Sequence, residues 1–214
     1  MIRIITIERE FGCGGGEIAH QLAERLGWKL WDQQLTEHIA KQAHCPMEVV
    51  MQREERTDPL YYRLFKSFLR GSYEGNLNAQ KLGVIDSESI LKHTQAAVLK
   101  VASEGHCVIV GRGSQLFLKD RDDTLRVFLY APREEKVRRL RERGKSQQEA
   151  EELVDNVDRE RKEFIAKYFH VAWPNPCVYH LMINTASGDA TTVEAITDFM
   201  KSFDLLHQEA LTSA

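Results

Sequence analysis

The hydrophobic and polar positions along the chain alternate in the manner of buried strands joined by amphipathic helices. Residues 2–7 are apolar and β-branched, which predicts a buried strand. Within residues 15–26, Ile18, Leu22 and Leu26 recur at every fourth position and mark one face of a helix. The same patterns predict the following further elements: strand 28–31, helix 33–44, helix 87–104, strand 107–110, strand 125–130, basic helix 133–145, charged helix 146–169, strand 178–184, and a closing helix with Val193, Ile196, Met200 and Phe203 on its apolar face.

The order of these elements predicts an α/β fold. Apolar strands that alternate with helices indicate a parallel sheet with helices on both faces, and we count five strands. Ligands of such sheets bind beyond the carboxyl ends of the strands. Four candidate segments fall at that edge: residues 8–16, Asp32, residues 111–113 and residues 184–188. Their convergence on one edge indicates a single functional site.

A chain of 214 residues is expected to form one domain, residues 1–214, with small inserted lids. The periodicity weakens from about residue 46 to residue 86, where charged helical pieces precede the stretch GSYEGNLNAQKLG. Weak patterning over such a length predicts an inserted subdomain.

Composition and charge narrow the classes of function. With 29 Lys and Arg against 32 Asp and Glu, the net charge of −3 gives no general attraction to nucleic acid or to an anionic membrane, so any anion site must be built locally. The opening MIRIITIERE is too short and too soon interrupted by charge for a signal peptide or a spanning helix. The four cysteines form no CxxC pair, which argues against a metal site or disulfide framework and fits a reducing cytoplasm.

The stretch IITIEREFGCGGGEIAHQLAERLG has the layout of a phosphate-binding loop. A strand, a glycine-rich turn and a helix N-terminus together offer backbone N–H groups and a partial positive charge. Residues 12–16 hold four glycines, more than a tight turn needs for geometry alone. Against the pattern GxxxxGK[ST], Gly14 takes the last glycine, Gly15 the lysine, Gly16 the hydroxyl residue and Arg9 the first glycine. The loop therefore lacks both the lysine and the hydroxyl of a standard Walker motif.

The chain resembles the cytidylate kinase-like family, a branch of the P-loop nucleoside monophosphate kinases. The stretches that carry the resemblance occur in the family order: ITIEREFGCGGGEIAHQLAERLG, WDQQL, VIVGRGSQLFL, LRVFLYAPREEKVRRLRER, DNVDRERKEFIAKYF and YHLMINT. It implies a five-stranded parallel core with a monophosphate-binding insertion, here roughly 33–86, and an arginine-rich lid, here roughly 133–169. It also implies transfer of the γ-phosphoryl group of ATP to CMP or dCMP with Mg²⁺. The sequence leaves open whether the chain forms a homodimer, and nucleic acid is not expected as a partner.

On the acceptor side, the resemblance points to Arg112 and Asp32. Arg112 follows a buried strand and matches the arginine of cytidylate kinases that binds the acceptor monophosphate. The alternative for Arg112 is an arginine that satisfies local carbonyl groups. Asp32 closes the second strand and matches an aspartate beside the acceptor site, but the residues after it depart from that segment, and a helix cap is an equal alternative.

The lid candidates are five charged residues: Arg139, Arg143, Arg159, Arg161 and Asp158. The stretch REEKVRRLRERGK reads as a lid helix whose arginines reach the ATP phosphates, because a planar guanidinium holds phosphate oxygens in pairs. In DNVDRERKEF, the aspartate would orient the two arginines that follow it. A solvated helix face with paired charges is an equal alternative for each of them.

The ATP side is assigned to the loop and to the end of the last strand. The predicted phosphate-binding residues are Arg9, Gly12, Cys13, Gly14, Gly15, Gly16, Glu17 and Ile18. Asn184 and Thr185 match the stretch that faces the adenine in this fold. Val110 replaces the aspartate that holds Mg²⁺ through water in cytidylate kinases, which leaves Glu17 as the metal candidate and the ligands undefined.

The loop also holds a thiol. Cys13 lies beside a helix N-terminus, which is expected to lower its pKa and to make the loop sensitive to oxidation. A small residue that merely fits the turn is the alternative.

Three functions remain in competition. The first is an active nucleoside monophosphate kinase with Arg9 or a lid arginine in place of the lysine. The second is a nucleotide-binding regulator that has lost catalysis, and the third is a P-loop kinase for another small acceptor.

Overall fold

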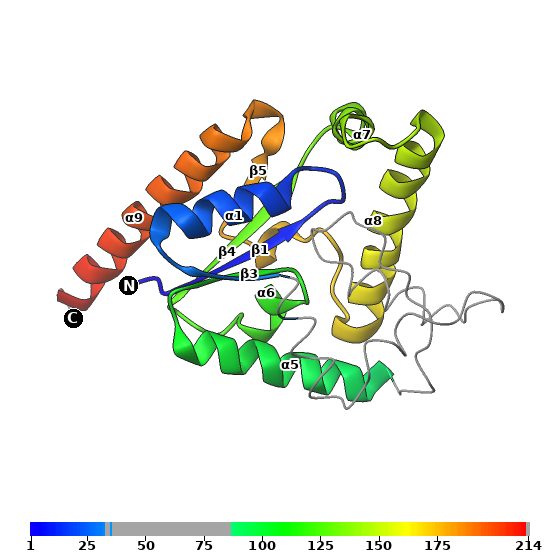
Figure 1. Ribbon diagram of the computed structural model, residues 1–214. Helices are drawn as coiled ribbons and strands as arrows, with labels where there is room; N and C mark the ends of the chain where they lie inside the picture. Colours follow the sequence, from blue (N-terminus) through cyan, green and yellow to red (C-terminus); the bar gives the residue numbers. More distant parts are fainter. Residues whose placement is uncertain (33–34, 36–86, 213–214) are drawn as a thin grey trace.

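The computed structural model describes residues 1–32, 35 and 87–212, and its centre is a sheet of five parallel strands. The strands lie in the order β2-β3-β1-β4-β5 (Figure 1). Their bounds are β1 Ile4–Arg9, β2 Lys29–Trp31, β3 Cys107–Val110, β4 Thr124–Tyr130 and β5 Leu181–Asn184. The parallel five-stranded sheet expected from the sequence is therefore confirmed.

Helices cover both faces of the sheet. In Figure 1, α1 and α9 lie together on one face, and α5 and α6 lie on the other. Helices α7 and α8 stand beyond the carboxyl ends of the strands. The helices and 3-10 turns have the following bounds: α1 Gly15–Leu26, α5 Ser87–Glu104, α6 Ser114–Phe117, α7 Arg133–Glu142, α8 Gln147–Phe169, η1 Pro176–Val178, η2 Thr185–Ser187 and α9 Asp189–Thr212.

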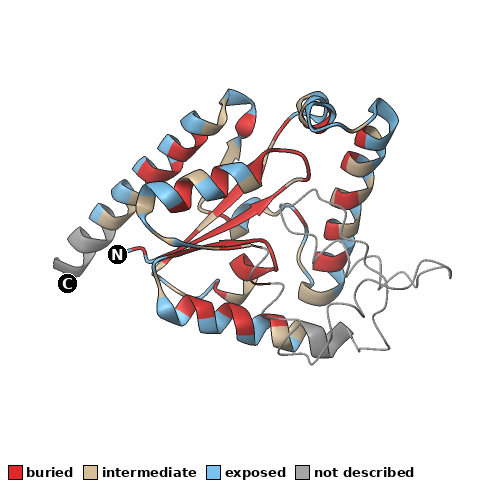
Figure 2. Ribbon diagram, in the orientation of Figure 1, coloured by how far each residue is buried: buried red, intermediate tan, exposed pale blue. Residues whose placement is uncertain are grey.

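The strands supply the core because both of their faces are covered. Every residue of β1 and of β3 is buried, and most of β4 is buried as well, as the red strands at the centre of Figure 2 show. Continuous apolar runs of this kind are expected where a parallel sheet lies between two helical layers. In α1 the predicted stripe faces the core, with Ile18 and Leu22 fully buried.

The lid region predicted at 133–169 forms two helices. α8 begins with a capping box, in which the Ser146 hydroxyl accepts from the Glu149 N–H and the Glu149 carboxylate accepts from the Ser146 N–H. Residues 143–146 therefore separate α7 from α8 by a short turn. Among the described residues, no helix has both the length and the apolar character needed to cross a membrane.

The structure differs from the sequence pattern at several places, among them the end of α7, which lies at Glu142 and not at residue 145. β1 continues to Arg9, two residues past the predicted end, because Glu8 and Arg9 pair with β4. β5 begins only at Leu181, since residues 176–178 form a 3-10 turn capped by the Asn175 side chain. The four-residue helix α6 was not predicted, as it is too short for a periodic pattern. The predicted helix 33–44, apart from residue 35, and the insertion expected at 46–86 lie outside the described residues.

Candidate active site

The glycine loop joins the buried end of β1 to the start of α1. Gly12 and Gly14 take left-handed backbone angles, with φ of 78° and 83°, which only glycine adopts without strain. At Gly14 a side chain would also collide, because its Cβ would lie 2.2 Å from Nη1 of Arg139. The first turn of α1 leaves backbone N–H groups without a helical acceptor, as at the start of any helix. The loop and helix thus have the main-chain chemistry of a phosphate site.

Cys13 is buried beneath this loop. Its Sγ lies 3.7 Å from the carbonyl oxygen of Leu129, and the side chain is fully buried. Burial raises the pKa of the thiol to about 11, and this outweighs the Gly15 N–H and the charges of Arg9 and Arg161, which act in the opposite direction. The expectation of a lowered pKa is therefore wrong, because it considered the helix terminus and left out desolvation.

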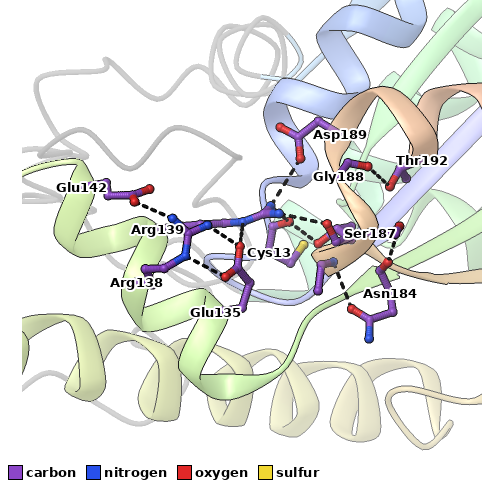
Figure 3. Close-up of polar contacts among 12 residues, drawn as sticks. Cys13, Glu135, Arg138, Arg139, Glu142, Asn184, Ser187, Gly188, Asp189 and Thr192 are labelled. Atoms are coloured by element: carbon purple, nitrogen blue, oxygen red, sulfur yellow. Dashed lines mark hydrogen bonds and ion pairs between the residues drawn. The ribbon is translucent and has the colours of Figure 1, made fainter.

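Arg139 fastens one side of the loop to the end of the sheet. Figure 3 shows its guanidinium reaching from α7 toward Cys13 and Asp189. Nη1 donates to the Cys13 carbonyl oxygen at 2.6 Å, and Nη2 donates to the Thr185 carbonyl oxygen at 2.9 Å. Glu135, one turn earlier on α7, accepts from Nε of Arg139 at 2.7 Å. The predicted lid residue Arg139 thus lies against the phosphate loop in this structure.

The two residues predicted on the adenine side have different surroundings. Thr185 is fully buried, and its hydroxyl donates to the same Cys13 carbonyl oxygen at 2.6 Å. Asn184 is exposed, and its side chain accepts from the Ala186 N–H at the start of η2. Thr185 therefore positions the loop, while Asn184 shapes the turn that follows β5.

Residues of α8 fasten the other side of the loop. Asp158 accepts from the Phe11 N–H at 2.8 Å, and Arg161 donates to the Arg9 carbonyl oxygen at 2.9 Å. Lys136 of α7 reaches Asp158 and Glu10, with Nζ to oxygen distances of 3.2 and 2.9 Å. Although burial works against its charge, these two acids hold the pKa of Lys136 above its ordinary value. The predicted lid residues Asp158 and Arg161 thus join α8 to the loop.

Three buried arginines gather near the carboxyl ends of β1 and β3. Arg9, Arg112 and Arg161 are 5%, 2% and 6% exposed. Burial lowers the pKa of Arg112 to about 9, and although Asp32 acts to raise it, Arg9 and Arg161 lower it further. Burial and the charge of Arg9 likewise lower the pKa of Arg161. An anionic ligand would relieve the repulsion among these three buried positive charges.

The position of Arg112 is set by the GRG turn, residues 111–113, which follows β3. Arg112 has a left-handed φ of 63° between Gly111 and Gly113, and the Gly111 N–H donates to the Ile7 carbonyl oxygen at 2.9 Å. This bond extends the pairing of β1 with β3 by one step and sets the start of the GRG turn beside the end of β1. A non-glycine residue with a positive φ that the surrounding structure enforces is a common sign of a functional position.

Other predicted site residues lie apart from this centre. Arg159 and Arg143 are exposed; Arg159 donates to Asn156 at 2.6 Å, and Arg143 lies at the end of α7. Glu17 is exposed and accepts from Gln21 at 3.1 Å. Ile18 is buried, and its N–H donates to Gly14 within the helix start. The roles assigned to these residues stay predictions.

Sequence reasoning missed three residues beside the loop. Lys136 and Glu10 form the ion pair described above, and Gln115 of α6 donates to the buried carboxylate of Glu8 at 3.2 Å. Nothing in the local pattern separated Lys136 from the other cations of its helix. Within the described part of the chain, no group of three or more His, Cys, Asp or Glu is placed to hold a metal ion.

Comparison with known proteins gives a family and a fold. The model of the cytidylate kinase-like family matches residues 4–187. A comparison with curated proteins found no match. Among solved structures, an uncharacterized protein from Eubacterium ventriosum is similar, with 23% identity, a TM-score of 0.69, and coverage of 94% of this chain and 99% of that chain.

Two kinases of known acceptor are similar in fold. A gluconokinase from Sinorhizobium meliloti has 12% identity and a TM-score of 0.55, and the match covers 97% of each chain. A shikimate kinase from Bacteroides thetaiotaomicron has 15% identity and a TM-score of 0.52, with coverage of 94% of this chain and 99% of that chain. At these identities the likeness shows the fold, which is that of P-loop kinases.

Proposed function

Because the chain belongs to the cytidylate kinase-like family, we propose that it is an ATP-dependent nucleoside monophosphate kinase with CMP or dCMP as acceptor. The observation that carries this proposal is the group of three buried arginines, Arg9, Arg112 and Arg161, beside the phosphate loop. Such a group suits a reaction in which two phosphate-bearing substrates meet, since transferring a phosphoryl group requires charge neutralisation and positioning.

The arginines favour an acceptor that carries its own phosphate. A monophosphate brings an anionic oxygen that attacks without loss of a proton, and guanidinium groups hold such an anion in a fixed orientation. A hydroxyl acceptor, such as the names of the gluconokinase and shikimate kinase imply for those proteins, would instead require a base near the attacking oxygen. Three buried cations beside the loop serve the first kind of chemistry better.

The residues divide the work as follows. Backbone N–H groups of the loop and of the first turn of α1 would bind the β- and γ-phosphates of ATP. Arg112, at the end of β3, would bind the acceptor phosphate, with Asp32 orienting it. Arg161 would neutralise charge between the two substrates while it keeps the loop in place through the Arg9 carbonyl group.

Mg²⁺ would arrive with ATP. Magnesium in kinases is held by substrate phosphates with one or two carboxylates and water. The described residues form no group of three or more potential metal ligands, which fits an ion carried by the nucleotide better than a resident one. When bound, the ion would neutralise charge on the transferred phosphoryl group.

A second candidate is a nucleotide-binding regulator without catalysis. The observation in its favour is that Gly15 and Gly16 stand where a lysine and a hydroxyl residue are usual, so two groups that assist transfer are missing from the helix start.

A release assay for ADP tests the proposal and separates the candidates. Purified protein with ATP and Mg²⁺ is offered CMP, dCMP, UMP, AMP, GMP, shikimate and gluconate in turn. We expect turnover with CMP or dCMP well above that with the others. Folded protein that turns over shikimate or gluconate and no monophosphate would refute the proposed acceptor class, and nucleotide binding without any turnover would favour the regulator.

A variant of Arg112 tests whether the activity depends on the arginine group. We expect Arg112→Met to lower kcat/KM for the monophosphate roughly 10- to 100-fold, because one charge-assisted contact to phosphate is lost. The matched control is Arg25→Met, since Arg25 is a surface residue that pairs with Glu194 between α1 and α9. Equal activity of the two variants would contradict the role of Arg112.

A further inference from the structure

Gly15 is glycine for a reason other than backbone conformation. Unlike Gly12 and Gly14, it lies within α1 and has no left-handed φ, so the backbone itself would accept any side chain. What crowds a side chain here is Arg9: a Cβ at Gly15 would lie 3.0 Å from Cγ and 3.1 Å from Cβ of Arg9. Most real Cβ atoms do not approach a neighbour so closely, and these two atoms belong to the fixed base of the arginine.

The two residues occupy exchanged positions of the Walker pattern. Arg9 stands where GxxxxGK[ST] has its first glycine, and Gly15 stands where it has lysine. The Cβ of a lysine at residue 15 would be crowded by the Cβ and Cγ of Arg9. Relative to the standard motif, the positions of the glycine and of the cation are thus exchanged, and the base of the Arg9 side chain lies beside Gly15.

One nitrogen of the Arg9 guanidinium, Nη2, is a buried donor without an acceptor among the described residues. The Arg9 side chain is 6% exposed, and Nη1 lies 3.7 Å from the Glu8 carboxylate. Nη1 also lies 2.2 Å from the position that a Cβ on Gly111 would take, so the group sits between the loop and the GRG turn. A buried donor without an acceptor is costly, and a ligand oxygen would satisfy it.

Two other cations that flank the loop, Arg139 and Lys136, are already engaged. Arg139 donates to Glu135 and to the Cys13 and Thr185 carbonyl oxygens. Lys136 donates to Glu10 and Asp158. These groups hold the loop in shape, and using either for phosphate would break contacts that position it.

We propose that Arg9 supplies from β1 the positive charge that a Walker lysine supplies from α1, and that Gly15 is glycine to give the Arg9 side chain room. The ligand is the β- and γ-phosphate end of a nucleoside triphosphate. The inference rests on the proposed function for the identity of that ligand, and it deepens it by naming the residue that replaces the missing lysine.

A reciprocal exchange tests the pair. The variants are Arg9→Gly, Gly15→Lys and the double variant that carries both changes, with Arg25→Gln as a surface control. For each, calorimetry measures affinity for a non-hydrolysable ATP analogue with Mg²⁺, a second titration measures affinity for CMP, and thermal melting reports folding. Arg9→Lys is added as a smaller change that keeps the charge.

We expect Arg9→Gly to bind the ATP analogue roughly 10- to 100-fold more weakly than the wild type, the loss expected for one charged contact to phosphate. Gly15→Lys alone should also bind weakly, because its side chain collides with Arg9. The double variant should recover most of the affinity, since it restores the standard arrangement of glycine and lysine. CMP affinity should change less than ATP-analogue affinity in Arg9→Gly.

Three results would overturn the inference. The first is a folded Arg9→Gly protein that binds the ATP analogue as tightly as the wild type. The second is a folded double variant that binds no better than Arg9→Gly, and the third is a loss in Arg9→Gly confined to CMP. A wild-type protein that binds the analogue through Arg9 but phosphorylates no acceptor would refute the proposed function and leave this inference standing.

Discussion

At the scale of single residues, burial decides the chemistry of the phosphate loop more than position in the motif does. Cys13 lies next to a helix N-terminus, yet its Sγ contacts the Leu129 carbonyl group inside the core, and its pKa rises to about 11. Leu129 belongs to β4, more than a hundred residues further along the chain. Sequence alone could locate the thiol in the loop, but the side on which it points depends on that distant strand.

The three cysteines of the described residues should therefore differ in reactivity. We expect an aromatic disulfide reagent to modify exposed Cys177 in the native protein and to leave Cys13 and Cys107 unmodified until the chain is unfolded. Mass spectrometry of peptides from native and denatured samples checks this. Labelling of Cys13 at the rate of Cys177 under native conditions would show that the loop opens, and Cys177→Ser serves as the control for background labelling.

At the scale of elements, α8, which the sequence predicts as part of a lid, acts as a support for the loop. Asp155 and Asp158 are three residues apart on it, and each pairs with a cation of α7, but their surroundings differ. Asp155 and Arg133 form a surface pair, with side chains 55% and 50% exposed. Asp158 is 16% exposed and also accepts the Phe11 N–H of the loop. In the sequence both are charged positions of one predicted helix, and only the packing of α8 against the loop makes their environments different.

Removing these two acids should have unequal effects. We expect Asp158→Ala to lower the free energy of unfolding by about 1–3 kcal/mol, because it leaves the Phe11 N–H without its acceptor and leaves Lys136 with Glu10 alone. Asp155→Ala should change it by less than about 1 kcal/mol, as is usual for exposed ion pairs. Urea unfolding of both variants measures the difference. Equal losses would mean that the contact between α8 and the loop contributes nothing beyond a surface pair.

A second prediction at the scale of elements concerns how the free energy of unfolding changes at acidic pH. Hydrogen bonds from Arg138 and then Arg139 hold the pKa of Glu135 at about 2, below its ordinary 4.5. A carboxyl with a lowered folded pKa stabilises the protein above its unfolded pKa and loses that contribution as the pH falls through the folded value. Glu135→Gln should therefore cost roughly 1 kcal/mol at pH 7 and almost nothing by pH 2.

Unfolding in urea at pH 7, 4, 3 and 2 follows this loss. The control is Glu142→Gln on the same helix, where the pair with Arg138 is exposed on both sides and is expected to matter little at any pH. A difference between wild type and Glu135→Gln that persists at pH 2 would mean that the glutamine change acts through packing rather than charge.

At the scale of the whole molecule, the fold follows from the sequence far more readily than the site does. The core strands are almost continuous apolar runs, and their alternation with helices determines a parallel sheet with its ligand edge at the carboxyl ends. The site depends on which side chains meet across that edge. The links from α7 and α8 to the loop join residues more than a hundred positions apart in the chain, and no local pattern encodes them. Arg9 and Gly15 lie in one local motif, but the sequence does not show that their atoms crowd each other.

The loop is fastened on both sides, and this leads to a prediction for the intact protein. Arg139 and Thr185 hold it to the end of β5, while Asp158 and Arg161 hold it to α8. A ligand bound in the loop should therefore stabilise the elements around it together. At a free concentration of an ATP analogue with Mg²⁺ near 100 times its Kd, the stabilisation is about 2.7 kcal/mol. For a chain of this size we expect the melting temperature to rise by roughly 5–10 °C.

Scanning calorimetry at several analogue concentrations checks this expectation, with adenosine, which has no phosphate, as the control ligand. The rise should grow with the logarithm of ligand concentration, and adenosine should give a much smaller one, because the binding energy is expected to come from phosphate contacts in the loop. A melting temperature that the analogue leaves unchanged, or raises no more than adenosine does, would mean that this loop does not bind phosphate. The same scans with CMP alone and with both ligands then show whether the arginine group binds its own phosphate independently, since two separate sites give shifts that add in free energy.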